Sequence, residues 1–521
     1  MRLKRVLSIT CVITSVLTAP IPAAATPTRF DLDRATIPQL RRLMDRGELT
    51  AVELTQAYLN RIRVVDPKVH AVLKVDDTAL AQAAASDRRR RAGHARGPLD
   101  GIPVLLKDNI DTRDLDTTAG SRALAGAPPL VDAPLVARLR GAGAVVLGKA
   151  NLSEWANFRS THSTSGWSGV GGQTNNPYSL DRNPCGSSSG SGAGIAASLA
   201  QVAIGTETDG SIVCPAGANG IVGHKPSLGL VSRTGVAPIS AEQDTAGPMA
   251  RNVTDVAITL SVLQGRDPAD RATLAYPGDQ TTDYAAALRP GALRGTRIGV
   301  WRLSGIDPDV DRVVARSIAV LRVNGATVVE VDLPYQDEIG AVEYPALVTE
   351  IGRDLPAYLR TRRGAPQTLQ ALVDFNRRDP VELSKFGQEL FEQALTAPGT
   401  DDPTYRRQRA TATSLARRSI DETLAANRLD AIVAPTNSPA WKTDYAAGDA
   451  YILGSSTPAA VAGYPDVSVP AGYAGELPIG LSFFGGRWSD ARVLSLAAAY
   501  EQASPVRRAP RYFTRTTGSG R

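Results

Sequence analysis

The chain has 521 residues, of which 43% are hydrophobic and 21% are charged. This balance is typical of a globular protein with a sizeable core, and it excludes disordered and fibrous proteins. The formal net charge is +6, and three positive charges lie within the first five residues. The remaining +3 does not favour nucleic acid as a partner.

The N-terminal segment, residues 1–25, has the pattern of a secretory signal peptide. A short positive stretch precedes an apolar run over Val6 to Leu17, and three alanines at positions 23–25 offer a cleavage site. A membrane anchor is disfavoured because the run is too short to span a bilayer. We therefore expect residues 1–25 to be removed and residues 26–521 to form a secreted or periplasmic domain, with no membrane contact after cleavage.

The first half of the chain predicts helices and strands in alternation. Thr50 and Glu53 form a capping box that begins a helix. Ile102 to Leu106 is expected to be a buried strand. A helix over residues 134–141 follows, and then a strand over Ala144 to Leu147.

The second half contains a strand–helix–strand unit. Arg297 to Trp301 and Thr327 to Leu333 are the predicted strands, and Val310 to Val323 is the helix between them. This order implies parallel pairing in an α/β sheet. Two more strands and a closing helix are expected at Ala431–Ala434, Ile479–Phe484 and Asp490–Gln502.

Domain boundaries are not apparent after the first segment. No Pro/Ser-rich linker divides the chain, so one large α/β domain is expected, with a short disordered tail from about residue 508. The stretch from Glu338 to Ala397 is charged and mostly helical. It is either an insertion that covers a substrate cleft or a purely structural layer.

The stretch from Asn183 to Pro226 contains two clusters of small hydroxyl residues and almost no charge. Gly186 to Gly190 fits the G-x-S-x-G pattern of a nucleophile elbow. That motif needs a strand directly before it and a later histidine. Residues 179–185 make a poor strand, and the last histidine, His224, lies far from the C-terminal end of the chain, where this motif normally places its histidine.

Two further interpretations of this stretch are weak. Gly192 to Ala197 fits the loose G-x-G-x-x-A dinucleotide pattern, but it too lacks a preceding strand. A flexible Gly/Ser linker is disfavoured because Ile195 to Ile204 follows directly as an apolar segment, which we expect to be helical and buried.

A set of motifs in a fixed order resembles the amidase signature family. These motifs are GIPVLLKDN, CGSSSGSGAG, GTETDGSIVCPA, GLVS and QDTAGPMAR, and weaker similarity extends from about Arg29 to Gln502. The GTETDGSIVCP variant and the segment NLSEWANFR are most similar to peptide amidases. The resemblance implies a single domain with a central mixed, largely parallel sheet covered by helices on both faces.

The resemblance also implies a Ser–cis-Ser–Lys triad. Ser211 would be the nucleophile, Ser187, in a cis peptide, would shuttle the proton, and Lys107 would be the base. A lysine can accept a proton only when neutral, and burial at the end of an apolar strand would lower its pKa. The oxyanion hole would consist of the backbone N–H groups of Thr208, Asp209, Gly210 and Ser211.

Several residues of this region stay open at the level of sequence. Ser188 either supports the hydrogen-bond network or has a structural role. Many family members carry glycine at position 209, so the Asp209 carboxylate either contacts substrate or binds a nearby cation such as Arg251. His162 and His224 are interpreted as structural residues, because neither has partners at metal-ligand spacing.

The two cysteines of the mature chain, Cys185 and Cys214, flank the hydroxyl clusters. An exported chain could pair them, and the alternative is two small buried thiols. Sequence does not decide between these alternatives, since connectivity cannot be deduced from it.

We therefore expect a secreted amidohydrolase that needs no cofactor or metal and releases ammonia from a carboxamide, with the C-terminal amide of a peptide as the expected substrate. The alternatives are an amidase or esterase for small aliphatic or aryl substrates and, from another class, a catalytically silent exported binding protein. The signal peptide disfavours the amidotransferase subunits of the family, which act inside the cell with partners.

Overall fold

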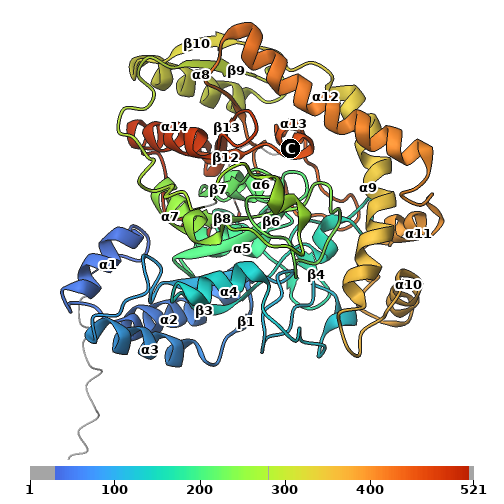
Figure 1. Ribbon diagram of the computed structural model, residues 1–521, viewed down its shortest axis with the longest axis horizontal. Helices are drawn as coiled ribbons and strands as arrows, with labels where there is room; N and C mark the ends of the chain where they lie inside the picture. Colours follow the sequence, from blue (N-terminus) through green and yellow to red (C-terminus); the bar gives the residue numbers. More distant parts are fainter. Residues whose placement is uncertain (1–29, 280, 516–521) are drawn as a thin grey trace, which may run out of the picture.

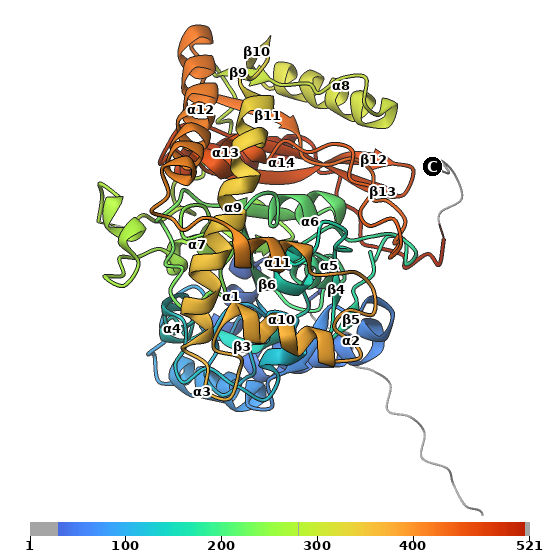
Figure 2. The same ribbon diagram turned by 90° about the vertical axis from the view of Figure 1, so that its right-hand side faces the viewer.

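An 11-stranded sheet runs through the molecule (Figures 1 and 2). The computed structural model describes residues 30–279 and 281–515. The strand order is β1-β3-β2-β6-β8-β7-β12-β13-β11-β9-β10. The strands are β1 (Val72–Val75), β2 (Pro103–Lys107), β3 (Val145–Ala150), β6 (Val202–Glu207), β7 (Val222–Lys225), β8 (Thr245–Ala250), β9 (Arg297–Val300), β10 (Thr327–Glu330), β11 (Ala431–Pro435), β12 (Asp466–Ala474) and β13 (Leu477–Phe484).

Helices flank this sheet, and a short hairpin of β4 (Trp167–Ser168) and β5 (Gly172–Gln173) lies outside it. The helices are α1 (Ile37–Asp45), α2 (Ala51–Val69), α3 (Ala79–Arg91), α4 (Pro134–Gly141), α5 (Ser189–Ala196), α6 (Val213–Ala218), α7 (Val253–Leu263), α8 (Pro308–Val323), α9 (Gln336–Leu359), α10 (Leu369–Arg378), α11 (Glu389–Thr396), α12 (Pro403–Asn427), α13 (Thr457–Ala462) and α14 (Asp490–Ala503). Short 3₁₀ turns lie at Arg122–Leu124, Glu154–Asn157 and Arg271–Ala275.

The predicted α/β domain with a mixed sheet is confirmed. The strand–helix–strand unit β9-α8-β10 pairs in parallel, with Thr327 opposite Arg297. The sheet is not largely parallel, however, because six antiparallel pairings stand against four parallel ones. Short connections such as the β12–β13 hairpin join neighbouring strands antiparallel.

Local sequence signals account for the start of α2. The Thr50 side chain accepts a hydrogen bond from the Glu53 N–H, and the Glu53 carboxylate accepts one from the Thr50 N–H. This capping box satisfies two N–H groups that a helix start leaves without partners. Leu54, Tyr58 and Ile62 then lie on one buried face, as their spacing predicts.

The prediction of a single helix over the apolar run from Ile195 to Ile204 is wrong. Helix α5 ends at Ala196, Ser198 has a left-handed backbone with φ of 58°, and the chain then enters β6. Both elements are buried on all sides, so hydrophobic periodicity does not distinguish helix from strand here.

The two ends of the chain differ in what the structure describes. The predicted signal peptide lies outside the described residues. The tail predicted to be disordered from about residue 508 instead contacts the domain as far as Phe513, whose carbonyl accepts a hydrogen bond from the Leu180 N–H. Of the helices in the described ranges, none combines the length and apolar character needed to cross a membrane.

Parallel pairing of β2 and β6 sets up the site. Leu106 lies opposite Ile204, so the carboxyl ends of both strands reach the same edge of the sheet. Lys107 ends β2, and Thr206 and Glu207 end β6. Side chains that follow such strand ends are well placed to converge.

Candidate active site

Lys107 is fully buried at the end of β2. Its Nζ lies 2.8 Å from Ser187 Oγ and 2.8 Å from Thr206 Oγ1, and it also donates to the Thr206 carbonyl oxygen at 3.2 Å. Burial lowers the pKa of Lys107 to about 7, although the carboxylates of Asp244 and Glu207 act in the opposite direction. A neutral amine is therefore available near neutral pH, and it is in contact with a serine hydroxyl.

Ser187 lies in the turn that leads into α5, and the Gly186–Ser187 peptide bond is cis, as the resemblance implied. A Cβ atom at position 186 would lie 2.2 Å from Ser153 Oγ, so a larger residue would force Ser153 or the turn itself to shift. The carbonyl of Ser187 accepts a hydrogen bond from the Ser153 N–H at 3.0 Å.

Ser188 links the two serine clusters. Its N–H donates to the carbonyl of Ser211 at 3.1 Å, and its Oγ donates to the Thr206 carbonyl at 3.0 Å and accepts from the Thr206 N–H at 3.1 Å. The backbone carrying Ser187 is thereby tied directly to the backbone carrying Ser211. The hydrogen bond from Ser211 to Ser187 that the relay requires stays a prediction.

Glu207 fixes the loop that carries Ser211. Its Oε2 accepts hydrogen bonds from the N–H groups of Ile212 and Val213 at 2.8 and 3.0 Å. Gly210 has φ of +78°, which favours glycine. Within the described residues, the N–H groups of positions 208–211 donate to no internal acceptor. They are free to bind a substrate oxygen, as expected for an oxyanion hole.

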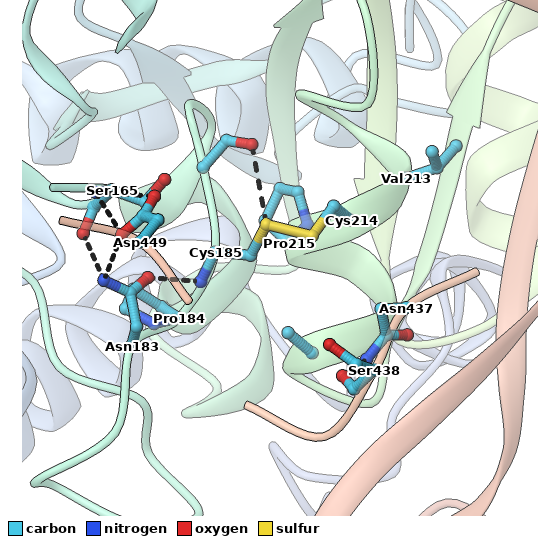
Figure 3. Close-up of a disulfide and its surroundings, with 12 residues drawn as sticks. Ser165, Asn183, Pro184, Cys185, Val213, Cys214, Pro215, Asn437, Ser438 and Asp449 are labelled. Atoms are coloured by element: carbon cyan, nitrogen blue, oxygen red, sulfur yellow. Dashed lines mark hydrogen bonds between the residues drawn. A yellow bond between two sulfur atoms is a disulfide. The ribbon is translucent and has the colours of Figure 1, made fainter. Parts of the chain in front are cut away.

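Cys185 and Cys214 form a disulfide (Figure 3), so the paired alternative holds. Cys185 directly precedes Gly186, and Cys214 is the second residue of α6, shortly after Ser211. The bond therefore ties together the two segments of the site. Figure 3 also shows Asp449 beside the disulfide, held by Ser165 and Asn183.

A cavity of about 360 Å³ opens above Ser211, and the disulfide forms part of its wall. Among the described residues, neither lysine, arginine nor histidine lines it. The wall combines aromatic rings with carboxyl groups. These are Phe158, Tyr344, Trp441 and Tyr451, and Asp209, Glu343 and Asp449.

Asp209 lines this cavity and does not bind Arg251. Its two oxygens accept hydrogen bonds from the hydroxyl groups of Ser456 and Thr457, at 2.5 and 2.6 Å, where α13 begins. Arg251 instead donates to the Ala200 carbonyl and to the Tyr58 hydroxyl. Asp209 thus anchors a distant segment to the nucleophile loop.

His162 and His224, the two histidines interpreted as structural, do not line this cavity. His224 is buried, with Nε2 3.2 Å from Asp490 Oδ1 and Nδ1 3.1 Å from the Asp466 carbonyl. His162 is exposed, and its Nδ1 lies 3.0 Å from Thr161 Oγ1.

Sequence reasoning missed Thr206 and most individual residues of the cavity wall. The stretch from Glu338 to Ala397, for which a covering over a substrate cleft was one alternative, supplies Glu343, Tyr344 and Leu347 of that wall. Thr206 lies in the motif that contains Ser211, and its place at the end of a strand parallel to the one that ends in Lys107 was the available signal. Glu343 and Asp449 carry no motif. Only the fold brings them to the cavity, because they lie far from the serine motifs along the chain.

Comparison with known proteins agrees with this geometry. A family model described as Amidase matches residues 53–494. The crystal structure of native peptide amidase from Stenotrophomonas maltophilia superposes with a TM-score of 0.88 at 49% identity, covering 92% of this chain and 98% of that chain.

Two curated relatives are similar over comparable lengths. A probable amidase of Arabidopsis thaliana is 39% identical over 93% of each chain. A glutamyl-tRNA(Gln) amidotransferase subunit of Roseiflexus castenholzii is 40% identical over 91% of this chain and 96% of its own length. With a family match over most of its length, the chain is an amidase-type hydrolase and belongs to the amidase signature family.

Proposed function

We propose that the protein hydrolyses the C-terminal amide of peptides, releasing ammonia, and that it acts outside the cytoplasm. The observation that carries the proposal is the cavity above Ser211, which is large enough for an amino acid residue and is lined by aromatic rings. The 49% identity to a peptide amidase structure supports the same substrate class.

In the proposed mechanism Ser211 Oγ attacks the carbonyl carbon of the amide. Its proton passes to Ser187 Oγ, and the proton of Ser187 passes to the neutral Lys107 Nζ, which becomes an ammonium group. The N–H groups of residues 208–211 bind the oxyanion of the tetrahedral intermediate. One such donor lowers a barrier of this kind by about 3 kcal/mol.

Collapse of the intermediate reverses the proton movement. Ser187 gives its proton to the leaving nitrogen and regains one from Lys107, so ammonia departs and an ester to Ser211 remains. Water then attacks this ester through the same relay. The products are a carboxylic acid and a regenerated Ser211, and one water molecule is consumed per ammonia released.

Export is the second element of the proposal. The predicted signal peptide supports it, and so does the disulfide, because disulfides persist in oxidising compartments. N-terminal sequencing of protein recovered from the periplasm or medium should begin near residue 26. Recovery of uncleaved protein from the cytoplasm alone would contradict this part of the proposal.

The decisive experiment is ammonia release across a panel of amidated peptides, aliphatic amides and aryl amides. We expect the largest kcat/KM for peptide amides, and no turnover or labelling by a serine-directed phosphonate in Ser211→Ala. A preference for simple amides would instead support the small-amide alternative. Full turnover in Ser211→Ala would overturn the mechanism.

A further inference from the structure

Glu343 on α9 is a carboxyl group in the cavity wall that the proposed mechanism does not use. Its side chain lines the same cavity as Ser211, and the residue is 7% exposed. Helix α9 is remote in sequence from the loop that carries Ser211, so the fold alone brings the two together. Because the carboxyl group faces the cavity that receives the substrate, it is placed to contribute to substrate binding.

Hydrogen bonding fixes the orientation of this carboxyl group. Its Oε1 accepts from Gln243 Nε2 at 2.6 Å, and the same Nε2 donates to the Thr208 carbonyl at 3.0 Å. Gln243 Oε1 in turn accepts from Arg409 at 3.0 Å. Among the described residues, Gln243 is the one hydrogen-bond partner of the Glu343 side chain, so Oε2 is left for the cavity.

The surroundings of the Glu343 carboxyl group disfavour its ionised form. Burial has the largest effect, Asp209 and Glu350 add repulsion, and together they raise the pKa of Glu343 to about 8. Gln243 and Arg409 act in the opposite direction. Arg409 is engaged by Glu350, at 2.6 Å to each oxygen, and forms no ion pair with Glu343. At neutral pH the group is a carboxylic acid with a proton to donate.

We propose that Glu343 is a specificity-determining residue that donates a hydrogen bond to the peptide carbonyl oxygen preceding the scissile amide. The inference rests on the proposed function. A peptide amide or an N-acylated amino acid amide carries this acceptor, and a simple alkyl amide lacks it. A free amino acid amide has an ammonium group in place of this acyl group. A neutral carboxylic acid is a weaker hydrogen-bond acceptor for an ammonium group than an ionised carboxylate is.

Three amides with the same phenyl group test the proposal. N-acetylphenylalanine amide carries the acceptor, phenylalanine amide carries an amine, and 3-phenylpropionamide carries neither. KM and kcat are measured by ammonia release between pH 6.5 and 9.5 for the wild type, Glu343→Gln, Glu343→Ala and the control Glu338→Gln. The control makes the same glutamate-to-glutamine replacement on an exposed residue of α9.

Ionisation of Glu343 above pH 8 removes the donor. In the wild type we expect KM for the N-acetyl amide to rise about tenfold by pH 9.5, the loss of one good hydrogen bond. KM for 3-phenylpropionamide should stay constant. Glu343→Gln keeps a donor without a titrating proton, so its KM should stay low and flat, whereas Glu343→Ala should show the raised KM at every pH. Glu338→Gln should match the wild type.

Three results would overturn the inference. They are an unchanged alkaline rise in Glu343→Gln, an unchanged KM in a folded Glu343→Ala, and a raised KM for phenylalanine amide alone in Glu343→Gln. The last would make Glu343 an anionic site for an ammonium group. Failure of the proposed function looks different, because the N-acetyl amide would then be a poorer substrate than 3-phenylpropionamide already in the wild type.

Discussion

Thr206 Oγ1 lies 2.8 Å from Lys107 Nζ, the same distance that separates this nitrogen from Ser187 Oγ. The lysine is thus held between two hydroxyl groups, one from the proposed relay and one from the neighbouring strand. Asn109 Nδ2 donates to the same threonine oxygen at 3.0 Å. Thr206 is not part of the cavity wall, so its role in the proposed mechanism is to position the base.

Thr206→Val should lower kcat about tenfold, because the isosteric side chain no longer accepts a hydrogen bond from Lys107. Loss of this acceptor also disfavours the ammonium form, so the pH at which activity appears should move to lower values. Thr206→Ser restores the hydroxyl and should restore both kcat and the pH profile. A threonine that only fills space would leave the pH profile of the valine variant unchanged.

The pH dependence of kcat/KM should report Lys107. The base must be neutral, and its pKa is lowered to about 7, so activity should fall as pH drops below 7 and level off above it. The measurement is kcat/KM for an amide without other ionisable groups, from pH 5 to 9. An activity plateau that extends down to pH 5 would exclude a lysine with this pKa as the base.

Lys107 should lower the stability of the fold. Its pKa falls from 10.5 to about 7 on folding. The resulting decrease in the free energy of unfolding is therefore complete below pH 7 and disappears as pH approaches 10.5. Lys107→Met should abolish turnover and raise the free energy of unfolding at pH 6 by an amount on the order of 1 to 4 kcal/mol. The gain should shrink as pH rises toward 10.

A second buried lysine provides the contrast for this measurement. Lys149 Nζ lies 3.6 Å from Asp108 Oδ1, and both residues are buried. Lys149→Met leaves that carboxylate without its partner and should destabilise the protein by about 3 kcal/mol or more. Equal effects of the two substitutions in denaturant unfolding would contradict the assignment of Lys107 as an unpaired buried base.

Removal of the disulfide should affect stability and catalysis together. Cys185 and Cys214 are 29 residues apart, and closing a loop of that size stabilises a fold by about 3 to 4 kcal/mol. The double variant Cys185→Ser/Cys214→Ser should lose stability of this order and also kcat, since both serine-bearing segments become less restrained. A thiol reductant should reproduce the loss in the wild type and leave the double variant unaffected.

Gly186→Ala should inactivate the enzyme. The added methyl group would collide with Ser153 Oγ, so Ser153 or the turn that carries Ser187 must move. Gly340→Ala is the matched control, because position 340 is in α9 with open space around it and should gain up to about 1 kcal/mol. Activity of Gly186→Ala near the wild-type level would show that this turn tolerates displacement.

Most elements of the fold and the motifs that carry Lys107, Ser187 and Ser211 could be recognised from sequence, and the reasons are local. The α2 capping box, the β9-α8-β10 unit and the serine motifs are each encoded within short stretches. An antiparallel pairing such as that of β7 with β12 could not be predicted, because these two strands lie in opposite halves of the chain. The positions of Glu343 and Asp449 in the cavity wall could not be predicted for the same reason, because both residues lie far along the chain from the serine motifs.

The site therefore divides into two parts along the chain. Its two serines are close in sequence, since Ser187 and Ser211 both lie between the two cysteines of the disulfide, and Lys107 joins them from the end of β2. The cavity wall, which would contact the substrate, is dispersed in sequence, and α9 and residues 441–457 supply much of it. Substitutions in these distant segments can alter which acyl group is accepted and leave the proton relay intact. Under the proposed mechanism, chemistry and selectivity should be separately mutable, which makes the cavity wall the place to redesign this enzyme.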